Sequence, residues 1–169
     1  MRKTQVLIVG AGPVGLTLAI DLAQQGIHCL LIDKKPGLEF LPKMERCNAR
    51  TMEIFRRMGL AEKIRAAGLR GDVSMDVFII RSMCETPWLR LEYPSVNEAR
   101  AEISAREDTS LPAEPYQLIS QYTLEPLLLE VVKGLPTVEV MYGCEFTNLV
   151  QDLDGVTARL HCEGREIEI

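Results

Sequence analysis

The sequence has fewer positive than negative charges. Its 169 residues include 19 Lys and Arg against 24 Asp and Glu, which gives a formal net charge of −5 and a pI near 5.2. Binding to a nucleic-acid backbone needs clustered basic residues that raise the pI of a domain. The densest basic positions, Lys34-Lys35 and Arg56-Arg57, are typical of solvated loops and helix faces. We therefore expect no nucleic-acid partner.

Long apolar runs are also missing. No stretch of about 20 uninterrupted apolar residues is present to span a bilayer. The apolar stretch that begins at Val6 is interrupted by glycines and Pro13, and it leads into Ile20-Asp21 instead of a small-residue cleavage site. We expect neither a signal peptide nor a membrane partner. With 47% hydrophobic and 25% charged residues, the composition is that of a soluble globular domain.

Closely spaced cysteine pairs are absent as well. The five cysteines are Cys29, Cys47, Cys84, Cys144 and Cys162. Their odd number and the lack of C-x-x-C spacing do not indicate a disulfide framework, so we expect a reducing, cytoplasmic location. His28-Cys29 and His161-Cys162 are adjacent on expected strands, and their side chains point to opposite faces. Zinc needs paired ligands at short spacing, so we expect no metal site.

The first thirty-odd residues alternate between two kinds of pattern. Gln5 to Val9 is apolar, a helical pattern then runs from Leu16 to a stop at Gly26, and Cys29 to Ile32 is apolar again. This order predicts strand, helix and strand. The unbroken apolar character of both strands favours a parallel sheet that is covered on both faces.

The middle of the chain is less regular. Two helices are expected, one after Asn48-Ala-Arg50-Thr51 that ends at Gly59 and one that ends at Gly68. Val73 to Ile80 is expected to be a strand. Four prolines between Cys84 and Pro115 favour loops and short strands there.

The last fifty residues predict a helix followed by strands. A helix is expected from Tyr122 to Lys133, with Pro126 tolerated in its first turn. The stretches 138–142, 144–151 and 156–162 follow as an expected antiparallel meander, with hairpin turns at Asp154-Gly155 and Glu163-Gly164. Because the final strand, Arg165 to Ile169, stops at the last residue, we expect a truncated chain.

The fold class is therefore α/β, with a Rossmann-like βαβ unit in a parallel sheet and antiparallel strands of a mixed second sheet. We expect residues 1–70 to form the dinucleotide-binding βαβ unit and its following helices. Residues 71–117 form a strand and an irregular part, and residues 118–169 form the helix and the meander.

A glycine turn, Gly10-Ala11-Gly12-Pro13-Val14-Gly15, connects the first strand to the first helix. Gly10 permits the tight turn, Gly12 lets the backbone approach a pyrophosphate, and Gly15 lets helix and strand pack closely. The phosphates then lie at the helix N-terminus, where unpaired N–H groups stabilise negative charge.

Asp33 ends the second strand, where it can hydrogen-bond a ribose 2′-hydroxyl and repel a 2′-phosphate. A glycine turn alone is a weak signal, but the strand, the helix and the acid stand at the expected distances. The pattern predicts an adenine dinucleotide and does not separate FAD from NAD.

Four segments together carry a resemblance to a family. They are Val6 to Leu16, Leu31 to Lys34, Pro42-Lys43 with Asn48 to Glu53, and Ile119 to Glu125. In order and spacing the sequence resembles the class A flavin monooxygenases, and within them the aromatic-ring hydroxylases that act on phenols and hydroxybenzoates. The similarity extends from Gln5 to the end of the chain.

The resemblance implies that the glycine turn, with Asp33 and Lys34, binds the ADP half of FAD. The segment Pro42 to Arg50 would run along the cofactor. Lys43 stands where many members have arginine, so it supplies a point charge instead of a planar fork. Arg50 is either near the flavin, at the helix start, or an ordinary surface residue. Gln121 matches the glutamine that hydrogen-bonds the ribityl or ribose part of FAD.

The implied activity is hydroxylation of a small aromatic substrate, phenolic or polyketide-like, by FAD with NADH or NADPH and O2. Two further FAD-contacting motifs of the family are absent, and Asp154-Gly155 is not one of them. We assign no catalytic residue, because Glu45 and Glu53 have no recognisable partner spacing. Substrate-pocket residues are expected between Val73 and Trp88, although Trp88 also fits a core or interface position.

Two alternatives stay open. One is another FAD- or NAD-dependent oxidoreductase that uses the same ADP-binding unit. The other is a dinucleotide-binding fragment without turnover. A homodimer is compatible with the resemblance.

Overall fold

The computed structural model describes residues 3–39 and 43–169, which form two compact units. The first unit contains residues up to 39 together with 121–169, and the second contains residues 43–120. Within these described ranges, no helix has the length and apolar character needed to cross a membrane.

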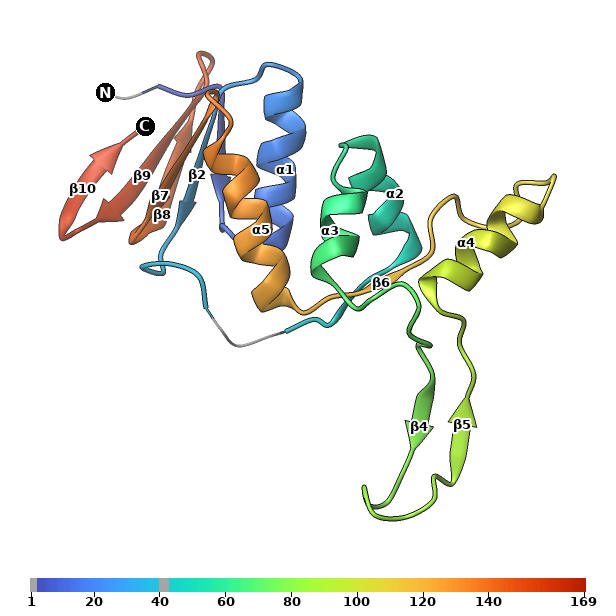
Figure 1. Cartoon of the computed structure of the whole chain (residues 1–169). Coiled ribbons are helices and arrows are strands. Elements are labelled where there is room, and N and C mark those ends of the chain that lie inside the picture. Colours follow the sequence, from blue (N-terminus) through green and yellow to red (C-terminus); the bar gives the residue numbers. More distant parts are fainter. Residues whose placement is uncertain (1–2, 40–42) are drawn as a thin grey trace. The chain divides into compact units, whose positions relative to one another are not determined.

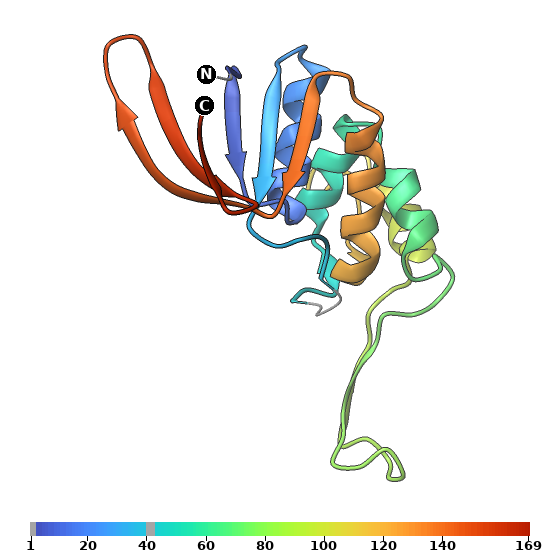
Figure 2. The ribbon, with the colours of Figure 1, turned by 90° about the vertical axis from the view of Figure 1, so that its left-hand side faces the viewer.

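The first unit has three layers. Its elements are β1 (Val6–Val9), α1 (Pro13–Gln24), β2 (Cys29–Asp33), α5 (Gln121–Lys133), β7 (Val138–Tyr142), β8 (Cys144–Gln151), β9 (Val156–Cys162) and β10 (Arg165–Glu168). A parallel sheet has the strand order β1-β2-β7, and an antiparallel sheet has the order β10-β9-β8. Helices α1 and α5 cover one face of the parallel sheet, and the antiparallel sheet covers the other (Figures 1 and 2).

The central strand β2 is buried on both faces. Leu30 and Ile32 pack into a core with the antiparallel sheet, where they meet Ala158 and Leu160. Leu31 points the other way and contacts α1 close to Gly15. Both faces are apolar because each has its own cover, which confirms the parallel strand-helix-strand unit.

The placement of β7 corrects the sequence analysis. We expected 138–142 to begin an antiparallel meander, but β7 pairs in parallel with β2, with Cys29 opposite Val138 and Asp33 opposite Tyr142. The preceding helix α5 makes a crossover connection, which brings β7 back in the direction of β2. The other strands do form the meander, and Gly155 and Gly164 adopt positive φ in its turns.

The cysteine prediction was wrong at one pair. Cys144 and Cys162 form a disulfide between β8 and β9. The two residues stand directly opposite each other in the antiparallel register, at a sequence separation of 18. An odd number of cysteines does not exclude one disulfide, and the pairing here follows from the register of the two strands.

The second unit is built from helices and short strand pairs. Its elements are β3 (Arg46–Cys47), α2 (Ala49–Arg57), α3 (Ala61–Ala67), β4 (Val77–Ile79), β5 (Leu89–Leu91), α4 (Val96–Ala105) and β6 (Gln117–Leu118). β3 pairs with β6 and β4 pairs with β5, both antiparallel. Helices α2 and α3 confirm the two expected helices, and Asn48 caps α2 by accepting the Thr51 N–H at 2.8 Å.

Two details of the helices differ from expectation. Helix α4 lies in the stretch where we expected loops and short strands, and it starts with a capping box in which Ser95 and Glu98 bond each other's backbone N–H. The four prolines obscured this signal. Pro126 is the sixth residue of α5 and is therefore in its second turn, where the N–H it lacks would have bonded the carbonyl of Tyr122.

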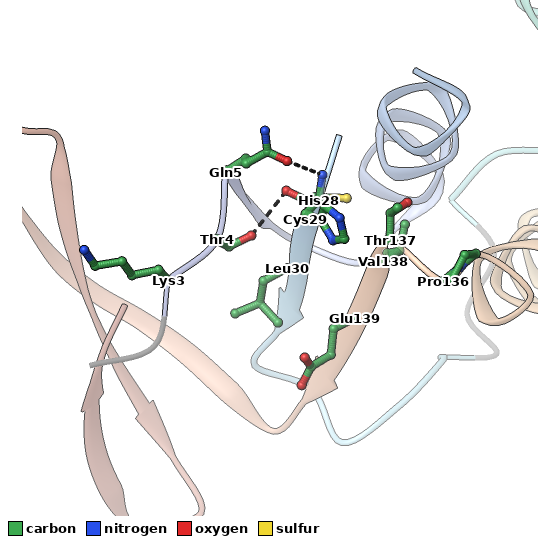
Figure 3. Close-up of a pocket in the computed structure, with 10 residues that line it drawn as sticks. All are labelled: Lys3, Thr4, Gln5, His28, Cys29, Leu30, Pro136, Thr137, Val138 and Glu139. Atoms are coloured by element: carbon green, nitrogen blue, oxygen red, sulfur yellow. Dashed lines mark hydrogen bonds between the residues drawn. The ribbon is translucent and has the colours of Figure 1, made fainter. Parts of the chain in front are cut away.

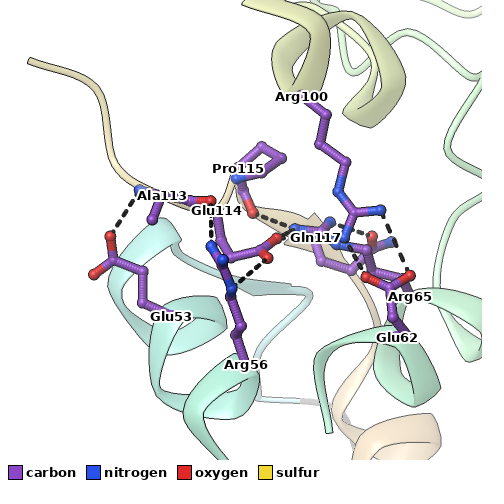
Figure 4. Close-up of polar contacts among 9 residues, drawn as sticks. All are labelled: Glu53, Arg56, Glu62, Arg65, Arg100, Ala113, Glu114, Pro115 and Gln117. Carbon is purple, nitrogen blue, oxygen red and sulfur yellow. Dashed lines mark hydrogen bonds and ion pairs between the residues drawn. The ribbon is translucent and has the colours of Figure 1, made fainter. Parts of the chain in front are cut away.

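A buried ionic network fixes the helices of the second unit to the strand β6 (Figure 4). The Arg65 guanidinium donates to Glu114 at 2.8 Å, to Gln117 at 3.0 Å and to the Pro115 carbonyl at 2.8 Å. Arg65 and Glu114 are each under 10% exposed, at 9% and 6%. Arg56 of α2 and Arg100 of α4 also pair with Glu114, at 3.8 Å and 3.5 Å, and Arg100 pairs with Glu62.

Candidate nucleotide-binding site

The glycine turn has the geometry that its sequence predicts. Gly10 has a φ of +107°, and its N–H donates to the Ile32 carbonyl at 2.7 Å, which ties the turn to β2. A Cβ at Gly15 would lie 1.9 Å from the Gly10 carbonyl oxygen. Only glycine can stand at position 15 without moving the turn.

The N-terminus of α1 has no side chain that caps it. Gly12 is the N-cap residue, Pro13 is the first helical residue, and the first turn contains no acidic side chain. Val14 is 83% exposed, so this end of the helix opens to the surface. Backbone N–H groups at such an end attract anions. A Cβ at Gly12 would meet nothing closer than Glu125 Oε1 at 3.7 Å, which leaves the backbone accessible.

Asp33 contacts the turn directly. Its Oδ2 accepts the Ala11 N–H at 2.8 Å, and its Oδ1 accepts the Lys35 N–H at 3.0 Å. Each carboxylate oxygen can accept more than one hydrogen bond, so both retain capacity for a hydroxyl. The carboxylate is thus held in place at the end of the central strand.

Gln121 begins α5 and, like Asp33, lines a cleft beside the glycine turn. Its Nε2 donates to Glu125 Oε1 at 2.7 Å, and Glu125 is only 5% exposed. A spacing of four residues puts both side chains on one face of the helix. The sequence analysis missed Glu125, although this spacing from Gln121 was visible.

One narrow cleft of about 30 Å³ brings most of these groups together. Its lining is Ala11, Gly12, Asp33, Lys35, Gly37, Leu38, Glu39, Gln121, Glu125 and Tyr142. The Lys35 ammonium bonds Glu39 at 2.5 Å. Lys34, which we expected at the cofactor, instead points toward Glu145 of the antiparallel sheet at 3.9 Å and does not line the cleft. Its role remains a prediction.

The remaining predicted residues belong to the second unit. Lys43 and Arg50 lie before and within α2, and the Arg50 guanidinium pairs with Glu53 at 3.0 Å on an exposed surface. Their roles at a cofactor stay predictions. Pro42, the start of the expected cofactor-lining segment, lies outside the described residues.

Cavity size alone does not identify this site. A groove of about 530 Å³ lies at the opposite, N-terminal ends of β1, β2 and β7, where Thr4, His28 and Thr137 line it (Figure 3). Ligands of open α/β sheets bind outside the carboxyl ends of the strands, which is where Gly10, Asp33 and Tyr142 stand. The narrower cleft is therefore the candidate nucleotide site.

The second unit has a groove of its own, of about 540 Å³. Aromatic side chains of Phe78, Tyr93 and Tyr116 line it together with Asp76 and Arg46. The Arg46 guanidinium lies over the Tyr116 ring at 5.9 Å from its centroid. The expected substrate-side segment, Val73 to Trp88, thus contributes side chains to an aromatic-lined groove. Among the described residues, no group of His, Cys, Asp and Glu could hold a metal ion.

Comparison with known proteins identifies the family of the chain. A family model described as an FAD binding domain matches residues 3–168. Aklavinone 12-hydroxylase RdmE of Streptomyces purpurascens is 33% identical over 164 residues, which cover 94% of this chain and 30% of the relative. 2,4-Dichlorophenol 6-monooxygenase of Cupriavidus pinatubonensis is 31% identical over 158 residues, which cover 94% and 26%.

A solved structure shows the same fold. The flavin-dependent monooxygenase PieE, in complex with FAD and substrate, matches with a TM-score of 0.83 at 30% identity, over 98% of this chain and 28% of that chain. The chain spans between 22% and 32% of the lengths of the curated relatives it matches. The resemblance to flavin monooxygenases and the α/β fold class are confirmed. With the family model covering all but three residues, the chain belongs to the FAD binding domain family.

Proposed function

We propose that this chain forms the ADP-binding part of an FAD-dependent monooxygenase. The complete enzyme would hydroxylate a small aromatic substrate, phenolic or polyketide-like, with NADH or NADPH and O2. Two relatives are named for hydroxylating aklavinone and 2,4-dichlorophenol, and their names support this substrate class.

One observation carries the proposal. An uncapped helix N-terminus at Gly12 lies beside a fixed carboxylate at Asp33, in a chain that the FAD-binding family covers almost completely. An anionic pyrophosphate fits the first feature, and a ribose hydroxyl fits the second. The absence of a side chain at Gly12 leaves room for the phosphates. These residues therefore fit the ADP portion of FAD.

When bound, FAD would supply the redox chemistry with NAD(P)H and O2, and the protein would supply binding and orientation. The backbone N–H groups after Gly12 would hold the pyrophosphate, and Asp33 would fix the ribose. Gln121, oriented by Glu125, would contact the ribityl or ribose part. The roles in FAD binding that the family resemblance implies for Lys34, Lys43 and Arg50 belong to the same proposal. No residue of this chain is assigned a catalytic role.

Further properties of the complete protein belong to the same proposal. We infer a cytoplasmic location, and a homodimer is compatible with it. The Cys144–Cys162 bond provides a test of this location, because disulfides are rare in the cytosol. Whether this pair is oxidised in cells therefore bears directly on the location.

The visible absorption spectrum tests the cofactor. We expect the complete protein to bind FAD and show flavin absorption, while residues 1–169 alone bind FAD weakly and do not turn over. No flavin absorption after FAD is added to the complete protein would refute the proposal and favour a nicotinamide-only enzyme. NAD(P)H oxidation that rises with a phenolic substrate would separate a hydroxylase from other flavoproteins.

A further inference from the structure

The Tyr142 side chain is a feature of the cleft that the proposed function does not yet use. Tyr142 is the last residue of β7 and stands opposite Asp33 in the parallel register. Neighbouring residues in register on parallel strands project to the same face of a sheet. Both residues line the same cleft, as does Glu125.

The Tyr142 hydroxyl is buried and has no hydrogen-bond partner among the described residues. Leaving a buried hydroxyl without a partner destabilises a protein, and native structures rarely do so without a reason. Burial raises the pKa of Tyr142, and the nearby Asp33 and Glu125 carboxylates raise it further. The phenol therefore keeps its proton and remains a hydrogen-bond donor near neutral pH.

The two other side chains with donor groups that line the cleft each bond a carboxylate already. The Gln121 amide donates to Glu125, and the Lys35 ammonium bonds Glu39. Asp33 and Glu125 are acceptors when ionised. A nucleotide in this cleft would meet carboxylates on several sides, and Tyr142 would offer it a neutral donor.

We propose that the Tyr142 hydroxyl donates a hydrogen bond to a ribose oxygen of the ADP portion, beside the contact made by Asp33. This inference rests on the proposed function. The place of Tyr142 in the sheet favours the ribose over the phosphates as its partner. Tyr142 neighbours Asp33, whereas the phosphates are expected at the N-terminus of α1. Tyr142 is thus a ligand-binding residue that helps to select a ribonucleotide.

Replacing Tyr142 by phenylalanine tests the contact with two separate measurements. In the free chain, Tyr142→Phe should leave urea unfolding unchanged or make the chain more stable, because the hydroxyl it removes has no partner. ADP affinity, measured by titration calorimetry, should fall about 5- to 30-fold. Tyr122→Phe is the matched control, since Tyr122 lies on α5 of the same unit and is 49% exposed. It should change neither quantity.

Deoxy analogues then identify the partner atom. With 2′-deoxy-ADP or 3′-deoxy-ADP, whichever lacks the contacted oxygen, wild type and Tyr142→Phe should bind equally. Equal ADP affinity of wild type and Tyr142→Phe would overturn the inference while leaving the proposed function intact. An undiminished effect with both analogues would overturn the ribose assignment. Failure of the wild-type chain to bind ADP at all would overturn this inference, whereas the proposed function is refuted only if the complete protein shows no flavin absorption.

Discussion

Alanine substitutions at two glycines of the turn should damage different properties of the chain. At Gly15 a Cβ would lie 1.9 Å from the Gly10 carbonyl oxygen, whereas at Gly12 its nearest neighbour would be Glu125 Oε1 at 3.7 Å. Gly12 also has a φ of −78° and a ψ of −174°, which alanine adopts freely. We predict that Gly15→Ala damages the fold and that Gly12→Ala damages only nucleotide binding.

The magnitudes follow from these contacts. Alanine inside a helix normally stabilises it by about 1 kcal/mol relative to glycine. The clash at Gly15 is with backbone and cannot be relieved by a rotamer change, so overpacking should cost about 3 kcal/mol or more and leave a net loss of about 2 kcal/mol. At Gly12, a weaker N-cap costs about 0.5–1 kcal/mol, and reduced freedom of the unfolded chain offsets about as much.

Nucleotide affinity should fall in Gly12→Ala, although the stability of this variant is nearly unchanged. A methyl group at position 12 would stand between the backbone and the pyrophosphate. Losing one charge-assisted hydrogen bond costs about 1.5–3 kcal/mol, which corresponds to roughly 10- to 100-fold weaker binding.

Urea unfolding of the free chain and an ADP titration of each variant measure the two effects separately. Equal loss of stability in both variants would refute the steric argument. Wild-type ADP affinity in Gly12→Ala would refute the placement of the phosphates.

Three further predictions concern stability. Glu114→Gln should destabilise the chain by about 3 kcal/mol in urea unfolding, because it leaves the buried Arg65 guanidinium without its anionic partner. Hydrogen bonds and Arg90 hold the pKa of Asp76 at about 2, below its usual 3.8. The ionised Asp76 should therefore stabilise the folded chain above pH 4, and this stabilisation should vanish as the pH falls toward 2. Asp76→Asn should flatten that part of the plot of unfolding free energy against pH. Reduction of Cys144–Cys162 should cost about 3 kcal/mol for a loop of this size, and the double alanine variant should show no effect of reductant.

Much of the fold could be predicted from local patterns. Hydrophobic periodicity and glycine stops predict the β1-α1-β2 unit, the helices α2, α3 and α5, and the β8-β9-β10 meander. Pairing partners could not be predicted in the same way. Strand β7 joins β2 because α5 carries the chain across the sheet, and the Cys144–Cys162 bond depends on the register of two strands. Both are long-range contacts, which residue composition and the number of cysteines do not predict.

The candidate site divides along the same line. Gly10, Gly12, Gly15 and Asp33 were predictable because a backbone turn and a strand end impose their residue types. Tyr142 was missed because its place beside Asp33 follows from the parallel pairing of β7. The glycines and Asp33 were thus visible in the sequence, whereas Tyr142, which reaches the site through strand pairing, was not.

The two hydrogen bonds that Asp33 accepts from Ala11 and Lys35 have a consequence for how the cofactor is recognised. They preorganise the carboxylate, so its conformational entropy is lost when the chain folds and not when the nucleotide arrives. Asparagine at this position would turn an NH2 group toward one of the two backbone donors. The turn would then become more mobile, and the entropy cost of ordering it would weaken nucleotide binding. A weaker affinity in Asp33→Asn would therefore report on the rigidity of the turn as well as on a lost ribose contact.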